Sequence, residues 1–128
     1  MARYRILVAD DYPSAAQITC TLLTMLGHEC RAVDCGAKAL EEAQAFQPDV
    51  AILDIGLPDI SGYDVARKLR AMLGAKLFLA AVTGWGQAQD RARAFAAGFD
   101  HHVLKPADAA KLKEILSCVD RALVTPEA

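Results

Sequence analysis

Three short runs of the chain are apolar throughout, and this feature constrains the fold more than any other. The runs are Ile6-Leu7-Val8-Ala9, Val50-Ala51-Ile52-Leu53 and Leu77 to Val82. A strand that lacks polar alternation must be covered on both faces, as in a parallel sheet packed between helices. Two further candidate strands, over residues 28–33 and 100–104, are mixed in polarity. We therefore expect these two at the edges of the sheet.

Segments with helical spacing lie between these strands. The first begins near Pro13, buries Ile18, Leu22 and Leu26, and ends at Gly27. Four more are expected at about Gly36 to Phe46, from Ser61 through Val65, Leu69 and Met72, at about Gln87 to Ala97, and along Leu112, Ile115, Leu116, Val119 and Leu123. Five strand–helix units in succession predict an α/β fold of the flavodoxin-like type. It is a doubly wound (βα)5 arrangement, with a five-stranded parallel sheet in the order 2-1-3-4-5 and helices on both faces.

The length and charge of the chain limit its function. Its 128 residues suit one domain, which we expect over residues 1–124, with 125–128 as a frayed tail. Fourteen Lys and Arg against sixteen Asp and Glu give a net charge of −2, which does not favour direct nucleic-acid binding or a membrane anchor. No apolar run is long enough to span a bilayer, and the first residues lack a signal-peptide pattern. We expect a cytoplasmic protein.

Four cysteines are present, at positions 20, 30, 35 and 118. Their spacing contains no C-x-x-C pair, and thiols stay reduced in the cytoplasm. Cys20 and Cys118 fall in helical patterns, where a free cysteine usually packs as a small apolar side chain. We therefore expect neither a disulfide nor a metal site from these residues.

Polar residues stand at the ends of four of the five predicted strands. Asp10-Asp11 follow the first strand and Asp54 the third, Thr83 ends the fourth, and Lys105-Pro106 follow the fifth. In an open α/β sheet, ligands bind beyond the carboxyl ends of the strands. We expect these side chains to meet in one crevice, although they are spread over most of the chain.

This set of residue types indicates phosphoryl chemistry. Three neighbouring carboxylates repel one another unless a cation joins them, and an oxygen-only donor set suits Mg²⁺. A hydroxyl (Thr83) and an ammonium (Lys105) facing that cation are what a phosphoryl group in transfer requires.

The motifs at these positions resemble the receiver domain of two-component response regulators, the CheY-like fold. They are Ile6-Leu7-Val8-Ala9-Asp10-Asp11, Asp54-Ile55-Gly56-Leu57-Pro58-Asp59-Ile60-Ser61-Gly62-Tyr63, Val82-Thr83-Gly84 and Leu104-Lys105-Pro106. The resemblance covers nearly the whole chain. The stretches around Asp54 and from Gly98 to Pro106 look like receivers of hybrid histidine kinases, so both an excised domain and a free-standing regulator are compatible with them.

The resemblance implies a role for each acidic residue. Asp54 would be the phosphoacceptor, taking a phosphoryl group from a phosphohistidine donor. Asp11 and Asp54 would bind Mg²⁺ directly, with the backbone carbonyl of Gly56 as a further ligand and Asp10 acting through water. The protein would not be an enzyme in the usual sense, although it would assist its own phosphorylation and dephosphorylation.

The remaining implied roles concern switching. Lys105 would pair with the phosphoryl oxygens, the Lys105-Pro106 bond would be cis, and Thr83 would move its hydroxyl toward the phosphoryl group. The partners would be a sensor histidine kinase or histidine phosphotransfer protein, and a downstream protein that docks on the fourth helix, fifth strand and fifth helix.

Three positions depart from the pattern of the family. The aromatic switch position holds His102, which acts either as a switch residue or as a solvated edge-strand histidine. The positions that flank the acyl phosphate hold Gly56 and Trp85. Because Gly56 cannot orient an attacking water and Trp85 could shield the site, we expect a long-lived phosphoryl group.

Three other functions are alternatives to this one. Gly84-Trp85-Gly86 resembles a dinucleotide-binding fingerprint, but Gln89 stands where the third glycine belongs. A Mg²⁺-dependent small-molecule phosphatase would need a second aspartate two residues after Asp54, where Gly56 stands. A receiver-like docking module that takes no phosphoryl group is the remaining alternative.

Overall fold

The computed structural model describes residues 3–84 and 88–124 of the chain. The strands are β1 (Arg5–Ala9), β2 (Glu29–Val33), β3 (Val50–Asp54), β4 (Phe78–Thr83) and β5 (His101–Leu104). The helices are α1 (Pro13–Met25), α2 (Gly36–Phe46), α3 (Gly62–Leu73), α4 (Ala88–Ala96) and α5 (Ala109–Val119). A 3-10 turn (Gly74–Lys76) follows α3, and a π-helical turn (Asp120–Val124) follows α5. Residues 125–128, which the sequence predicts as a frayed tail, lie outside the residues that the structure describes.

The five strands form one parallel sheet in the order β2-β1-β3-β4-β5. This confirms the predicted doubly wound, flavodoxin-like fold. The three apolar runs form β1, β3 and β4 in the middle of the sheet, and the two mixed segments form its edges. Residues of β3 and β4 are buried along their whole length, because helices cover both faces.

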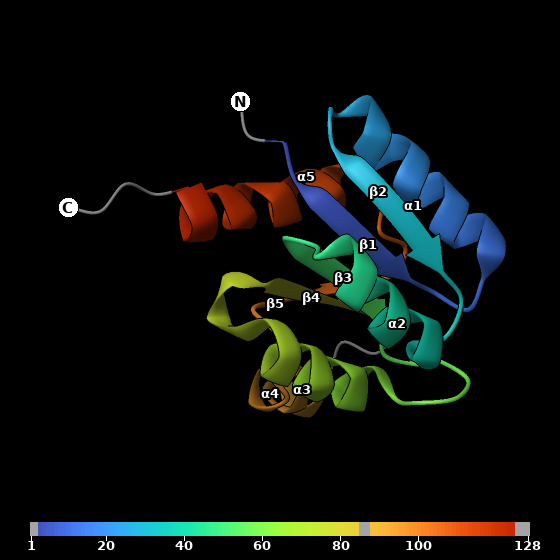
Figure 1. Ribbon diagram of the computed structural model, residues 1–128, viewed down its shortest axis with the longest axis vertical. Helices are drawn as coiled ribbons and strands as arrows, with labels where there is room; N and C mark the ends of the chain where they lie inside the picture. The colour runs from blue at the N-terminus through green and yellow to red at the C-terminus, as the bar shows by residue number, and fades with distance from the viewer. Residues whose placement is uncertain (1–2, 85–87, 125–128) are drawn as a thin grey trace.

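Two apolar cores lie on opposite faces of the sheet. Helices α1 and α5 cover one face, and α2, α3 and α4 cover the other (Figure 1). Successive strand residues point to opposite faces, so Ile6 and Val8 enter the first core while Leu7 and Ala9 enter the second. This three-layer arrangement leaves the ends of the strands as the open part of the molecule.

The helix boundaries follow local signals, with one error in our predicted buried face. Pro13 starts α1, and the side chain of Ser61 accepts a hydrogen bond from the backbone N–H of Asp64 at the start of α3. In α1, however, Ile18 is 61% exposed and Leu23 is fully buried. The helix is therefore rotated from the predicted orientation: Ala16, Thr19 and Leu23 form its buried face, and Leu22 and Leu26 pack partly buried beside them.

The expectation about the cysteines was wrong. Cys20 of α1 and Cys30 of β2 form a disulfide, whereas Cys35 and Cys118 are free. The sequence spacing gave no sign of this pair, because the two residues meet only when α1 packs beside the edge strand.

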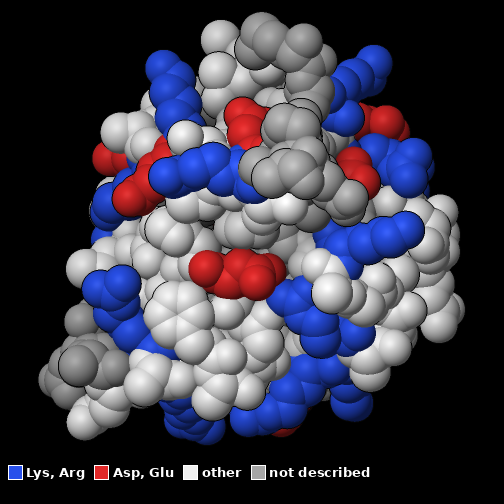
Figure 2. All heavy atoms as spheres, turned by 90° about the vertical axis from the view of Figure 1, so that its left-hand side faces the viewer, with Lys and Arg blue, Asp and Glu red and all other residues white. Residues whose placement is uncertain are grey.

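Among the described residues, no helix is both long enough and apolar enough to cross a membrane. Figure 2 shows one face of the molecule, on which separate groups of Lys and Arg lie between groups of Asp and Glu. The charge on this face is therefore mixed.

Candidate functional site

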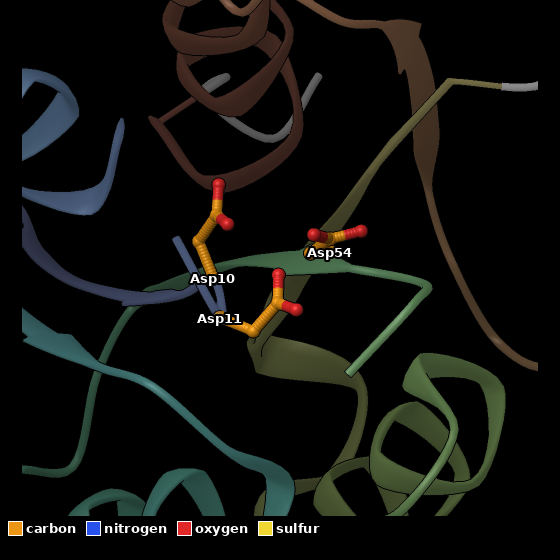
Figure 3. A group of neighbouring side chains, drawn as sticks. All are labelled: Asp10, Asp11 and Asp54. Carbon is orange, nitrogen blue, oxygen red and sulfur yellow. The ribbon is translucent and has the colours of Figure 1, made fainter. Parts of the chain in front are cut away.

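The carboxylates of Asp10, Asp11 and Asp54 converge at the ends of β1 and β3. One oxygen atom from each lies within 4.8 Å of the others, and the three side chains point toward a common space (Figure 3). Adjacent parallel strands end at the same side of a sheet, and this topology brings together residues that are 43 or more positions apart in the chain. The predicted acidic crevice is present.

Asp54 is the most buried of the three, with only 6% of its surface exposed. Its Oδ2 atom accepts a hydrogen bond from Lys105 Nζ at 2.7 Å, and its Oδ1 atom accepts one from the backbone N–H of Gly56 at 3.0 Å. A buried carboxylate must be paired. Here the two hydrogen bonds fix the orientation of the Asp54 carboxylate and pair it with the ammonium group of Lys105.

The pKa values of Asp10 and of the neighbouring Lys105 are both raised in this site. Burial raises the pKa of Asp10, and the negative charges of Asp54 and Asp11 add to this effect, whereas the backbone N–H of Tyr12 and the charge of Lys105 oppose it. Burial alone would lower the pKa of Lys105, but the hydrogen bond and charge of Asp54, together with Asp10 and Asp11, raise it. The crevice therefore favours bound positive charge.

The loop after β3 packs so closely that it requires glycine at position 62. A Cβ atom there would lie 2.6 Å from the carbonyl oxygen of Asp54 and 2.7 Å from Cα of Ile55. The backbone N–H of Gly62 also donates to the carbonyl of Ile55 at 2.9 Å. This contact turns the chain back on itself and places Gly56 beside Asp54.

Asp59 holds the same loop from its other side. Its two carboxylate oxygens accept hydrogen bonds from the backbone N–H groups of Gly36 and Ala37, the first residues of α2. Asp59 and Gly62 both belong to the motif after Asp54, but the motif alone predicts no structural role for either residue. The signal available was the Asp-x-x-Gly spacing directly before a helix, which does not reveal a contact with α2.

Thr83 and Lys105 lie side by side at the ends of β4 and β5. Thr83 is 2% exposed, and its backbone carbonyl accepts a hydrogen bond from the backbone N–H of Lys105 at 2.8 Å. The Lys105-Pro106 peptide bond is cis, as the resemblance implied. All five predicted site residues, Asp10, Asp11, Asp54, Thr83 and Lys105, are therefore found at the ends of the predicted strands.

His102 is buried, so the alternative of a solvated edge-strand histidine is wrong. Only 9% of its surface is exposed, because α4 and α5 flank β5. Burial lowers the pKa of His102, as do the nearby charges of Arg91 and His101, whereas Asp90 opposes the shift. The neighbouring His101 contacts Glu114 and Cys118 of α5 instead. Trp85, the proposed shield, lies outside the described residues.

A surface hollow of about 490 Å³ adjoins the acidic cluster. Asp10 and Lys105 border it on the side of the cluster, and it extends between the start of α1 and the segment that follows β5. Its remaining lining is mainly apolar and consists of Tyr12, Ala15, Ile18, Thr19, Val82, Pro106 and Ala107. A protein surface that reaches the cluster can therefore enter from this side.

Comparison with known proteins agrees with this geometry. Residues 6–117 match the family model for the response regulator receiver domain. The chain belongs to this family. The receiver domain is also similar in structure to a CheY-like receiver domain from Methylobacillus flagellatus, with 31% identity, a TM-score of 0.80, and coverage of 92% of this chain and 99% of that one. A CheY-like receiver from Methanospirillum hungatei gives a TM-score of 0.88 at 23% identity, over 98% of this chain and 100% of that one, which shows a shared fold.

Curated relatives place similar receivers in different larger proteins. The transcriptional regulatory protein KdpE of Mycobacterium tuberculosis is 39% identical over 101 residues, which are 79% of this chain and 44% of KdpE. The sensor histidine kinase RcsC of Salmonella typhi is 30% identical over 112 residues, which are 88% of this chain and 12% of RcsC. The chain thus spans about half or less of the curated relatives it matches. The receiver is a module found in both kinds of protein.

Proposed function

We propose that this receiver domain accepts a phosphoryl group on Asp54 from a phosphohistidine of a sensor histidine kinase or histidine phosphotransfer protein. The single observation that carries the proposal is the 2.7 Å contact between Lys105 Nζ and a buried Asp54 that sits inside a three-carboxylate cluster. A structural ion pair would not need two more carboxylates beside it. A phosphoacceptor needs both the acidic cluster and the lysine.

The donor set fits Mg²⁺. Asp11 and Asp54 would hold the ion directly, with the carbonyl of Gly56 as a further ligand and Asp10 acting through water. All of these donors are oxygen atoms, as a hard cation prefers. When bound, Mg²⁺ would neutralise the carboxylates and the incoming phosphoryl oxygens.

The transfer itself needs little from the protein beyond positioning. A carboxylate oxygen of Asp54 attacks the phosphorus atom, the N–P bond of the donor breaks, and its electron pair stays on the departing imidazole, which takes up a proton. Lys105 moves from the carboxylate of Asp54 to the phosphoryl oxygens, so its positive charge follows the negative charge. Its raised pKa keeps it protonated throughout.

Phosphorylation of Asp54 would change the docking surface through the residues that lie next to the phosphoryl group. The hydroxyl of Thr83 would turn toward the phosphoryl group and vacate space near His102, which is buried between α4 and α5. This would bias a two-state equilibrium of the surface formed by α4, β5 and α5, where we place the downstream partner. His102 then takes the place of the aromatic residue usual in the family.

The decisive experiment is intact-mass analysis after incubation with acetyl phosphate and Mg²⁺. Wild type should gain one phosphoryl group, whereas Asp54→Asn should gain none. Asp64→Asn is the matched control, because Asp64 is an exposed aspartate on α3 that pairs with Arg67, and it should behave as wild type. Absence of the adduct from all three proteins would favour the docking module instead.

Two further measurements separate the remaining alternatives. Millimolar Mg²⁺ should raise the melting temperature of wild type, because the cluster exists only in the folded state, and should have a smaller effect on Asp11→Asn. An unchanged melting temperature would contradict the metal assignment. Continuous turnover of a generic phosphate ester would indicate the phosphatase.

A further inference from the structure

The disulfide between Cys20 and Cys30 connects two surface elements of the receiver domain. Their Cα atoms are 5.5 Å apart and their sequence separation is 10 residues. Cys20 lies on α1 and Cys30 on the edge strand β2, and both residues are partly exposed. Small solutes can therefore reach the pair without the protein unfolding.

The packing of α1 beside β2 places the two cysteines next to each other. Cys30 pairs with Ile6 of β1 and packs on the face of the sheet that α1 covers. Cys20 borders the same apolar core from α1, which is anchored by the buried Ala16 and Leu23. Since these apolar contacts do not depend on the bond, we expect the dithiol form to keep the same fold.

We propose that Cys20 and Cys30 form a reversible dithiol–disulfide site that exchanges with low-molecular-weight disulfides. The thiolate of one cysteine attacks the small disulfide, whose S–S bond breaks and releases one small thiol. The thiolate of the second cysteine then attacks the mixed disulfide and releases the other. In total, the two protein thiols lose two electrons and two protons, and one small disulfide is reduced to two thiols.

The bond acts on a part of the receiver that matters for its site. Helix α1 begins two residues after Asp11, and its outward side carries the exposed Ile18 and Met25. Oxidation ties the middle of this helix to the edge of the sheet and restricts its motion. The mobility of α1 thereby depends on the redox state of the surroundings. This inference stands independently of phosphorylation at Asp54.

The test is equilibration of the native protein with mixtures of reduced and oxidised glutathione, followed by alkylation of free thiols and intact-mass analysis. Wild type should pass reversibly from four alkylated cysteines to two, with a peptide that links Cys20 to Cys30 in the oxidised form. Cys20→Ser and Cys30→Ser should lose this transition. Cys35→Ser and Cys118→Ser are matched controls, because both residues are free thiols, and should keep it, as should Asp54→Asn.

Three results would overturn the proposal: four free thiols at every glutathione ratio, glutathione adducts without closure of the bond, or reduction that occurs only in denaturant. Amide hydrogen exchange then tests the effect on the helix. Reduction should speed exchange in the middle of α1 by roughly tenfold, and the double variant C20S/C30S should match the reduced protein. Equal exchange in both forms would refute the restraint on α1.

Discussion

The carboxylate of Asp59 accepts a hydrogen bond of 2.7 Å from the backbone N–H of Gly36, 23 residues earlier in the chain. Its second oxygen accepts another from the N–H of Ala37 at 2.9 Å. The cap of α2 is therefore supplied by the loop that also carries Gly56, so the stability of this helix and the shape of the acidic site depend on one side chain.

Replacement of Asp59 by alanine should lower the stability of the domain and weaken Mg²⁺ binding together. The hydrogen bonds from Ala37 and Gly36 lower the pKa of Asp59 from 3.8 to about 2. Its contribution to stability is thus fully present above pH 3.8 and is lost as the pH falls through about 2. Denaturant midpoints of wild type and Asp59→Ala should differ by a constant amount above pH 5 and converge in acid. Asp34→Ala is a suitable control, because Asp34 makes only an exposed ion pair with Lys38.

On the proposed function, Lys105 and Mg²⁺ would compete for the carboxylate of Asp54, so replacement of Lys105 should separate metal binding from phosphoryl transfer. Lys105→Met should bind Mg²⁺ about tenfold more tightly, equivalent to about 1.4 kcal/mol, because one positive charge leaves the cluster. It should also accept a phosphoryl group from acetyl phosphate more slowly than wild type. Calorimetric titration measures the first effect and time-resolved mass analysis the second. Weaker Mg²⁺ binding in this variant would contradict the electrostatic account.

His28 should make the stability of the domain fall in mild acid. Its Nδ1 atom accepts the backbone N–H of Tyr4 at 3.1 Å, and burial lowers its pKa below 6.5, although the charge of Asp120 opposes the shift. A lowered histidine pKa means that the stabilisation is present above pH 6.5 and is lost as the pH falls through the folded-state value.

The free energy of unfolding should therefore decrease between pH 7 and pH 5, with a slope of at most about 1.4 kcal/mol per pH unit from this residue. His28→Asn should be less stable by about 1–2 kcal/mol at pH 7 and should show a shallower slope. The buried His102 contributes in the same direction, so the slope should decrease without vanishing. If urea titrations gave the same slope for wild type and His28→Asn, His28 would have the same pKa in the folded and the unfolded protein.

Gly62→Ala should disturb Asp54 from eight residues away. The added Cβ would meet backbone atoms of Asp54 and Ile55 at 2.6–2.7 Å, and neither strand nor loop backbone can yield cheaply. We expect a loss of about 1–3 kcal/mol in unfolding free energy and slower phosphorylation. Gly84→Ala is the control, because a Cβ at Gly84 meets no described atom within 4 Å. Equal effects of the two substitutions would point to chain entropy instead of a steric clash.

Most of the fold and of the candidate site could be predicted from the sequence, because both depend on local patterns. Hydrophobic periodicity indicates the strands and helices, and the polar residues at strand ends indicate the site. The uninterrupted apolar runs of β1, β3 and β4 indicated the central strands, and the two mixed segments indicated the edges. The polar residues at the strand ends indicated the cluster of Asp10, Asp11 and Asp54, with Lys105 beside it.

What could not be predicted depends on contacts between elements. The rotation of α1 depends on how Leu23 and Ile18 fit a sheet surface that the helix sequence does not contain. The Cys20–Cys30 bond depends on the packing of α1 beside β2. The burial of His102 depends on α4 and α5, which cover an edge strand that is polar in sequence.

The order of strands in the sheet also determines when, during synthesis, the residues of the site can assemble. Asp10, Asp54, Thr83 and Lys105 stand at the ends of four different strands, and the last of these, β5, is an edge strand late in the chain. During synthesis the acidic residues are complete long before their lysine emerges, and pairings this distant in sequence form slowly. A partly made chain that ends before β5 lacks Lys105, the ammonium group that pairs with Asp54 in the complete domain. On the proposed function, the chain would gain the ability to take a phosphoryl group only after β5 has joined the sheet.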